Sequence, residues 1–321
     1  MAVYTEVTDE DLTAFMGHYD LGEVVSCKGI AEGVENSNYL LQTTRGPYIL
    51  TLYERRVNPG DLPFFLSLTE HLAGAGVKCP LPIHDRDGNT LRSLCGRPAA
   101  IITFLTGMWP RRIAPHHCAE LGKALAGLHV AGSSFRHRRE NNLSVGGWRK
   151  LHGQIGPEAA DSLHGGLHAL LGREIEELGA DWPTALPVGV IHADLFPDNV
   201  FFLGETCSGL IDFYFACTDF LAYDIAICLN AWCFEPDGAF NATKGQRLFA
   251  SYQQFRPLSP DEISALPILA RGAAMRFLLT RLYDWINTPP GALVKPKDPR
   301  EYLRKLNFHR SVSSVAAYGF A

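Results

Sequence analysis

The sequence predicts an α/β fold, α+β in strict terms, with a strand-rich first third followed by a longer, mainly helical part. In the first third, short apolar runs alternate with turn residues, which is typical of strands. Further on, apolar residues recur at helical spacing in several long segments, interrupted once by a strand–loop–strand pattern. The helical segments are 115–132, 159–178, 259–287 and 300–315, and the interruption lies at 188–213.

Composition places the chain among ordinary globular proteins. It has 321 residues, enough for one or two domains, with 46% hydrophobic and 20% charged residues. A net charge of -5 gives no support for a nucleic-acid or anionic-membrane partner. No apolar run reaches membrane-spanning length, and the acidic N-terminus lacks the features of a signal peptide. Eight cysteines without a C-x-x-C motif indicate buried, reduced thiols and a cytoplasmic location. The oligomeric state is not indicated.

The N-terminal elements begin with an amphipathic helix over 8–19, capped by Thr8 or Asp9. A strand, a Gly-rich turn and a second strand follow over 24–41, with Gly29 and Gly33 at the turn. Backbone N–H groups of such a turn can reach phosphate oxygens, although a plain hairpin accounts for two glycines equally well. The next strand is 47–53.

A helix is predicted over 61–76, with Asp61 as N-cap and its apolar side chains facing inward. A turn at 86–89 and a buried strand over 98–105 complete the first third. After the helix at 115–132, in which His129 reads as a packed or capping residue, the polar stretch from 136 through the following S-V-G-G-W is read as a surface loop.

The stretch 188–213 organises the chain because it places His192, Asp194, Asn199 and Asp212 at fixed offsets between apolar runs. Phosphoryl transfer needs a carboxylate that accepts the proton of the attacking hydroxyl, and hard oxygen ligands for Mg²⁺. An H-x-D-x-x-x-x-N loop followed by a strand ending in Asp supplies both. The alternative, ordinary Asx turns in a hairpin, explains the residue types but not the four offsets together.

This pattern resembles the catalytic core of the protein-kinase-like superfamily. Ala193 and the Asp198-Asn199 pair resemble the branch that phosphorylates small molecules, which holds aminoglycoside phosphotransferases, choline kinases, methylthioribose kinases and bacterial homoserine kinases. The strings G-I-A-E-G-V-E-N-S-N-Y, Y-I-L-T-L-Y-E and L-P-F-F-L-S-L-T-E-H-L are similar to the homoserine kinases. The resemblance implies a bilobal fold with a small β-sheet N-lobe carrying one main helix, 1–105, and a larger, mainly helical C-lobe, 106–321.

The resemblance also implies an ATP- and Mg²⁺-dependent phosphorylation of homoserine to O-phosphohomoserine, a step of threonine biosynthesis. Asp194 is then the catalytic base, Asn199 and Asp212 bind Mg²⁺, and His192 braces the loop. The implied nucleotide contacts are made by residues of the Gly-rich hairpin and of the strand near residue 105: Gly29, Gly33, Ser37, Asn38, Thr103, Phe104 and Leu105.

One position departs from the protein-kinase pattern. Where a Lys holds the nucleotide phosphates in protein kinases, this sequence has Thr51. A nearby cation, Lys28, Arg55 or Arg56, is one replacement, and the backbone with Mg²⁺ is the other. Glu70 matches the helix carboxylate that pairs with that Lys, or is a surface residue.

Residues after the catalytic stretch are candidates for support and for acceptor binding. Asp224 is expected to cap the next helix and to tie down the catalytic loop. An amino-acid acceptor needs a cation for its carboxylate, which makes Arg271, Arg276 and Arg281 candidates, together with Trp232 as a pocket aromatic. Two alternatives stay open: a kinase of another small hydroxyl compound (an aminoglycoside, choline or methylthioribose), and a kinase-like nucleotide-binding protein without turnover.

Overall fold

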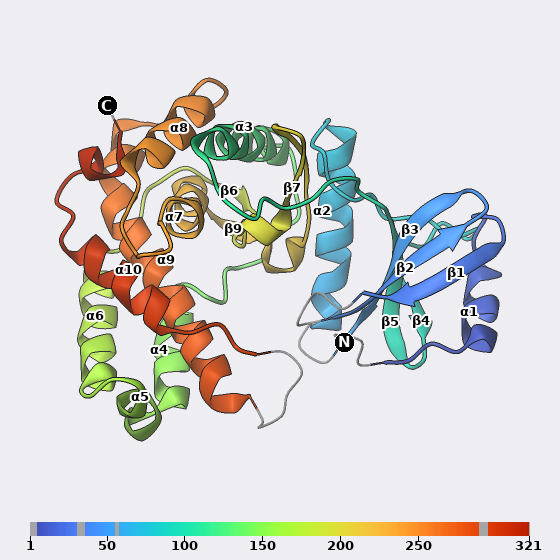
Figure 1. The fold of residues 1–321 in the computed structure, drawn as a ribbon, viewed down its shortest axis with the longest axis horizontal. Coiled ribbons are helices and arrows are strands. Elements are labelled where there is room, and N and C mark those ends of the chain that lie inside the picture. Colours follow the sequence, from blue (N-terminus) through green and yellow to red (C-terminus); the bar gives the residue numbers. More distant parts are fainter. Residues whose placement is uncertain (1–4, 31–35, 55–57, 289–294, 321) are drawn as a thin grey trace. The chain divides into compact units, whose positions relative to one another are not determined.

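The computed structural model describes residues 5–30, 36–54, 58–288 and 295–320. The chain divides into two compact units (Figure 1). Unit 1 comprises Met1–Gly107 together with Ser208–Tyr214, and unit 2 comprises Met108–Cys207 and Phe215–Ala321. The sequence predicted two contiguous units that divide at residue 105. In the structure, unit 1 also contains a short segment from the middle of the chain.

Unit 1 is built on a five-stranded antiparallel sheet with the strand order β1-β2-β3-β5-β4. Alternating side chains of the sheet form one core with the inward face of helix α1 (Asp9–Met16), which Thr8 caps through its side chain as predicted. Helix α2 (Leu62–Gly74) follows a short 3-10 turn, and its predicted inward face is buried. Asp61 stands at its N-cap position but makes no side-chain capping bond. The strands are β1 (Val24–Gly29), β2 (Asn36–Thr43), β3 (Gly46–Tyr53), β4 (Arg92–Leu94) and β5 (Arg97–Thr103).

Unit 2 is mainly helical and is arranged around α9 (Pro260–Asn287), which contacts α4, α6, α7 and α10 (Figure 1). A capping box of Ser259 and Glu262 begins this helix. The other helices are α3 (Pro115–Gly132), α4 (Val145–Ile155), α5 (Pro157–Leu163), α6 (Leu167–Asp181), α7 (Leu221–Trp232), α8 (Ala242–Gln253) and α10 (Arg300–Arg310).

Two helix predictions and one loop prediction in unit 2 need correction. The helix predicted over 159–178 is two helices, because the chain turns at Gly166, whose φ of 75° few other residues tolerate. The expected surface loop ends at residue 144, and α4 begins directly after it despite two adjacent glycines. Packing of the buried Trp148 outweighs their low helix propensity. The closing helix ends at Arg310 rather than 315.

Two small two-stranded sheets frame the catalytic stretch. β6 (Val188–Ile191) pairs with β9 (Cys217–Phe220), and β7 (Val200–Leu203) pairs with β8 (Thr206–Leu210). The predicted strand–loop–strand pattern is therefore confirmed, with the catalytic loop between β6 and β7. Within unit 1, Leu210 donates its N–H to Lys78 O at 2.9 Å, and a Cβ on Gly209 would lie 2.8 Å from the same oxygen. Only glycine fits at this close approach.

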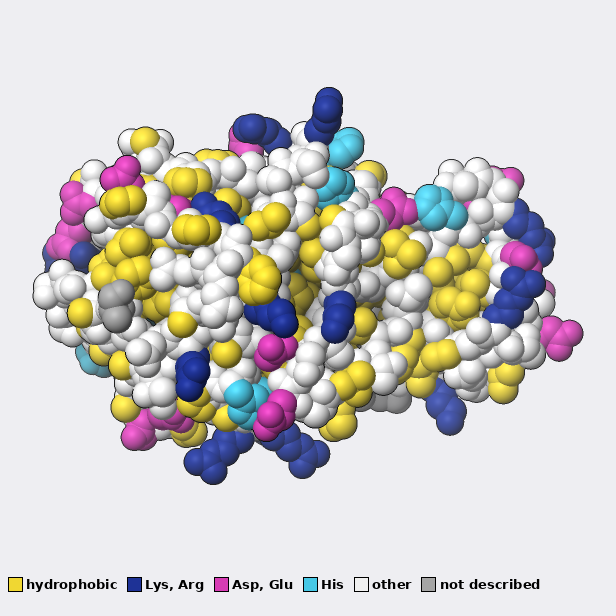
Figure 2. Space-filling view, turned by 90° about the horizontal axis from the view of Figure 1, so that it is seen from above, with side chains coloured by type: hydrophobic (Ala, Val, Ile, Leu, Met, Phe, Trp, Pro, Cys, Tyr) yellow, Lys and Arg dark blue, Asp and Glu magenta, His cyan; other side chains and the backbone are white. Residues whose placement is uncertain are grey.

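Two further expectations from composition can be compared with the structure. Six of the eight cysteines are buried, as expected. By length and composition, one helix in the described residues, α9, could cross a membrane, but 67% of its most apolar window is buried in the protein. That burial is typical of a core helix. The expectation that no apolar segment reaches membrane-spanning length therefore has one exception by length and composition, α9. On the face shown in Figure 2, basic and acidic side chains are interspersed.

Candidate active site

The catalytic loop, residues 192–199, leaves β6 and ends in a 3-10 turn at Pro197–Asn199. Its second residue, Ala193, has φ of 64°, a conformation that costs energy for a residue with a Cβ. Such strain persists only where surrounding contacts hold the backbone in place. Within unit 2, the helix side chains of Asp224, Trp232 and Arg276 hydrogen-bond to the backbone of this loop.

Asp224 on α7 holds the first peptide groups of the loop. Its fully buried carboxylate accepts the backbone N–H of His192 at 2.7 Å and that of Ala193 at 2.9 Å. The predicted tie is thus confirmed, but the predicted N-cap is wrong. Phe220 occupies the N-cap position, and Asp224 lies in the first turn of α7, where a negative charge is favoured by the helix dipole.

His129 on α3 supports Asp224 from the other side. One ring nitrogen lies 3.3 Å from Asp224 Oδ2, and the other lies 2.7 Å from the Tyr252 hydroxyl. Burial lowers the pKa of His129, which favours a neutral ring. Burial alone would raise the pKa of Asp224, but the His129 hydrogen bond and the backbone N–H donor outweigh it and keep the pKa below its usual value. His129 is therefore a packed residue, as predicted, and Asp224 is ionised at neutral pH.

Trp232 and Arg276 contact the backbone of the catalytic loop. Trp232 is fully buried, and its Nε1 donates to Leu195 O at 2.7 Å. Arg276 is 1% exposed, and its Nη1 donates to Ala193 O at 2.5 Å. Both side chains thus bond the loop backbone, and their contact with an acceptor stays a prediction.

Asp194 and Asn199 are brought together by the loop. Asn199 Nδ2 donates to Asp194 O at 2.8 Å and approaches Asp194 Oδ2 at 3.3 Å. Since its amide nitrogen is engaged, the amide oxygen of Asn199 is the atom with metal-ligand chemistry. Asp194 itself is half-buried.

In unit 1, Asp212 follows β8 with φ of 64°, the second strained non-glycine residue at a predicted site position. Close by, the Tyr214 hydroxyl donates to the Tyr53 hydroxyl at 3.3 Å, and the two rings meet edge to face. Burial, with a contribution from the negative charge of Asp212, raises the pKa of Tyr53 to about 12. These hydroxyls are therefore neutral hydrogen-bonding groups beside Asp212.

The hairpin predicted to contact the nucleotide is only partly described, because Gly33 lies outside the described residues. Arg55 and Arg56, two of the proposed replacement cations, also lie outside them. Gly29 ends β1 and is exposed. Ser37 is fully buried and donates to Glu54 Oε1 at 2.7 Å. The hydroxyl of Thr51 donates to Asn38 Oδ1 at 2.8 Å. Ser37 and Asn38 thus bond within the sheet.

Sequence reasoning missed the partly buried ion pair of this sheet. Arg97 Nε lies 3.1 Å from Glu54 Oε2, whereas Glu70, the predicted helix carboxylate, pairs with His84 at the surface. The only sequence signal for Glu54 is its position directly after the apolar strand 47–53.

The predicted adenine contacts lie at the end of β5. Thr103 closes the strand: its N–H donates to Leu81 O and its hydroxyl accepts from Leu81 N, both at 2.9 Å. Phe104 and Leu105 follow the strand, and Phe104 is 41% exposed.

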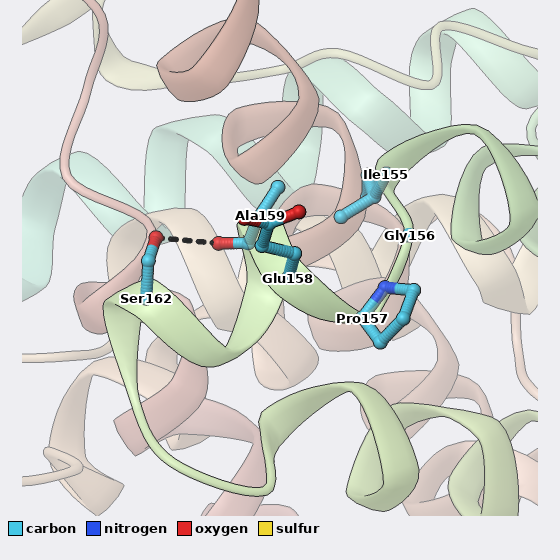
Figure 3. Close-up of a pocket in the computed structure, with 6 residues that line it drawn as sticks. All are labelled: Ile155, Gly156, Pro157, Glu158, Ala159 and Ser162. Atoms are coloured by element: carbon cyan, nitrogen blue, oxygen red, sulfur yellow. Dashed lines mark hydrogen bonds between the residues drawn. The ribbon is translucent and has the colours of Figure 1, made fainter.

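A separate hollow of about 510 Å³ lies at the junction of α4 and α5 (Figure 3). Its walls are Ile155, Gly156, Pro157, Glu158, Ala159 and Ser162. Ser162 donates to Ala159 O at 2.7 Å, so its hydroxyl serves the helix. None of the predicted site residues lines this hollow.

Comparison with known proteins agrees with the loop chemistry. Residues 26–258 match the model of the phosphotransferase enzyme family. The chain is 65% identical to a homoserine kinase of Paramagnetospirillum magneticum, with 99% of each chain covered. It is 63% identical to a homoserine kinase of Rhodospirillum rubrum, with 100% of each chain covered.

The chain belongs to the phosphotransferase enzyme family, among the homoserine kinases.

Several solved structures share the fold at much lower sequence identity. An amicoumacin kinase in complex with AMP-PNP has a TM-score of 0.70 at 14% identity, covering 94% of this chain and 92% of the other. A choline kinase from Cryptosporidium parvum has a TM-score of 0.67 at 14% identity, covering 94% of each chain. The predicted fold class, with a sheet-bearing N-terminal part and a helical C-terminal part, is confirmed.

Proposed function

We propose that this protein transfers the γ-phosphoryl group of ATP to the side-chain hydroxyl of L-homoserine, forming O-phospho-L-homoserine for threonine biosynthesis. The observation that carries the proposal is the full-length identity of 65% and 63% to two homoserine kinases. ATP as donor is supported by family members solved with AMP-PNP and with ADP.

Asp194 is the proposed catalytic base. It accepts a hydrogen bond from the acceptor hydroxyl, orients it and takes its proton as the oxygen attacks phosphorus. His192 braces the loop, since its N–H is held by Asp224 and its ring nitrogen Nδ1 lies 3.3 Å from the N–H of Asp194. The remaining loop contacts, from Trp232 and Arg276, keep Asp194 oriented.

Asn199 and Asp212 are each proposed as ligands of Mg²⁺. Both present the oxygen atoms that Mg²⁺ prefers, and an ion held by few protein ligands is usual where phosphates complete its coordination. Bound Mg²⁺ would neutralise charge on the nucleotide phosphates. Of the nucleotide contacts, Gly29, Asn38, Phe104 and Leu105 keep their proposed roles. Thr103 and Ser37 act as structural supports.

Asp212→Asn should raise the Mg²⁺ concentration for half-maximal activity by roughly tenfold or more, because one ligand charge is lost. A Mg²⁺ titration of activity at saturating nucleotide measures this. Asp198→Asn is the matched control: Asp198 is an exposed neighbour of Asn199, 3.5 Å from Lys297. Equal Mg²⁺ requirements in wild type and Asp212→Asn would remove Asp212 from the metal site.

The substrate is tested by ADP release with Mg·ATP and a panel of L-homoserine, L-serine, choline, a methylthiopentose and an aminoglycoside. Turnover with homoserine alone supports the proposal. Turnover with another acceptor instead would keep the mechanism and exclude the substrate. ATP binding without turnover of any acceptor would favour a nucleotide-binding protein.

We also propose a cytoplasmic location, because the eight cysteines are free thiols and six of them are buried.

A further inference from the structure

Within unit 2, α9 and α10 bring two cations onto one carboxylate. Glu301 Oε2 lies 2.6 Å from Arg281 Nη1, and its Oε1 lies 2.6 Å from Lys305 Nζ. Lys305 also donates to Asn230 O at 2.8 Å, which fixes it inside the unit. We call Arg281, Glu301 and Lys305 the α9–α10 charge cluster.

The charge cluster has one positive charge more than it has negative charges. Burial alone would raise the pKa of Glu301, but the charges of Lys305 and Arg281 outweigh it and lower the pKa to about 2. Glu301 is therefore ionised and neutralises only one of the two cations. The cation side chains are 10% and 7% exposed, whereas Glu301 is 44% exposed. An uncompensated positive charge with so little solvent is costly, and a bound anion would offset the cost.

The charge cluster lies beside the catalytic loop. The guanidinium of Arg281 is 4.4 Å from the ring centre of Tyr302 and 5.9 Å from that of Phe196. Phe196 is a loop residue whose N–H donates to Asp194 O at 2.8 Å. The cation is thus close to the loop segment that carries the proposed base.

Tyr302 supplies a second, independent sign of a ligand. Its side chain is fully buried, and its hydroxyl has no hydrogen-bond partner among the described residues. A buried hydroxyl usually has one. Burial raises the pKa of Tyr302, and the charges of Arg281 and Asp194 act on the same hydroxyl in opposite directions. The hydroxyl is therefore a neutral hydrogen-bond donor.

The other two arginines of α9 have partners elsewhere, although the buried Nε of Arg276 has none among the described residues. Arg276 donates to Ala193 O, and Arg271 pairs with Glu174 and with Glu177 on α6. Homoserine carries its carboxylate and its hydroxyl at opposite ends of a short chain, so a cation near Asp194 is needed to read the carboxylate. A guanidinium binds a carboxylate with two parallel hydrogen bonds.

We propose that Arg281 binds the α-carboxylate of the acceptor and that Glu301 is a positioning residue that orients the guanidinium. The inference rests on the proposed function. It makes Arg281 a residue that distinguishes an amino-acid acceptor from an amino alcohol lacking the carboxylate.

The test compares Arg281→Gln with wild type on L-homoserine and on 3-aminopropan-1-ol, which is homoserine without its carboxylate. We expect kcat/KM for homoserine to fall by roughly ten- to a hundredfold, mainly through KM, because a charged hydrogen-bonded pair is lost. For the amino alcohol, kcat/KM should stay within about twofold of wild type. Arg271→Gln is the matched control, with the same residue type and helix but a pairing to α6, and should behave as wild type on both.

A second readout uses compounds that cannot be phosphorylated. L-2-aminobutanoate and propylamine lack the hydroxyl and differ from each other by the carboxylate. Their inhibition constants, measured in competition with L-homoserine, therefore report binding to the acceptor site alone. Arg281→Gln should weaken inhibition by the amino acid and leave that by the amine unchanged. If this variant does not fold, Arg281→Lys, which keeps the charge but not the fork, is compared in the same way.

The two proposals fail differently. If wild type does not turn over homoserine, the proposed function is wrong. Suppose that wild type does turn over homoserine. If the Arg281 variant then changes kcat/KM or the inhibition constant equally for the compound with the carboxylate and the compound without it, or changes neither, the carboxylate is bound elsewhere and the inference is overturned.

Discussion

Asp194→Asn should lower kcat by about 10²- to 10⁴-fold, the usual contribution of a general base, while KM for both substrates changes little. Asparagine has the shape of aspartate but cannot take the proton of the acceptor hydroxyl. The loop should keep its conformation, because Asn199 also donates to the backbone oxygen of residue 194. Steady-state kinetics on L-homoserine and ATP, with circular dichroism as a check of the fold, measure both effects.

Asp198→Asn is again the control, since it removes a carboxylate from the same loop at an exposed position. If the Asp194 variant kept activity within a small factor of wild type, the assignment of the base would be wrong.

Asp224→Ala is expected to have the largest effect on stability, lowering the free energy of unfolding by about 3–5 kcal/mol. The change removes the acceptor of two backbone N–H groups and the partner of His129, all of them buried. Urea unfolding at neutral pH measures the loss. Asp219→Asn, in the neighbouring strand β9, is the comparison: that carboxylate accepts from Asn141 at 2.7 Å and should cost less.

The pH dependence of this contribution has a definite sign. The pKa of Asp224 is lower in the folded protein, so its stabilisation is fully present above the unfolded pKa of about 3.9. It is lost as the pH falls through the folded pKa. The stability difference between wild type and Asp224→Ala should therefore be constant near neutrality and shrink in acid. A difference that grew in acid would contradict an ionised Asp224.

The catalytic loop was predictable because its chemistry is local. His192, Asp194 and Asn199 stand within eight consecutive positions between two apolar strands, and the spacing alone places them on one turn. The supports of the loop carry no such signal. Arg276 bonds a residue 83 positions earlier in the chain. Only the packing of α9 decides that Arg276, rather than Arg271 or Arg281, bonds the loop backbone.

Polar residues in strands are hard to interpret from sequence for a related reason. Ser37 stands in the hairpin that was predicted to contact the nucleotide, and its residue type suits a phosphate contact. In the structure, the alternation of side chains along β2 points Ser37 inward, where its hydroxyl donates a hydrogen bond to Glu54. Which face of a strand is buried depends on the partner helix as well as on the strand.

Because residues 208–214 belong to unit 1, that unit depends on a late segment of the chain when it folds during synthesis. The N-terminal part of a protein generally folds first as it leaves the ribosome. Here, however, Tyr214 packs on Tyr53 and Phe65, and Leu210 bonds to Lys78. The first unit cannot be completed until most of the second unit's early helices, α3 to α6, have also been made. A nascent chain that ends near residue 107 would expose the apolar surface that the segment about a hundred residues later covers in the finished protein. This surface therefore needs protection from aggregation until that segment has been made.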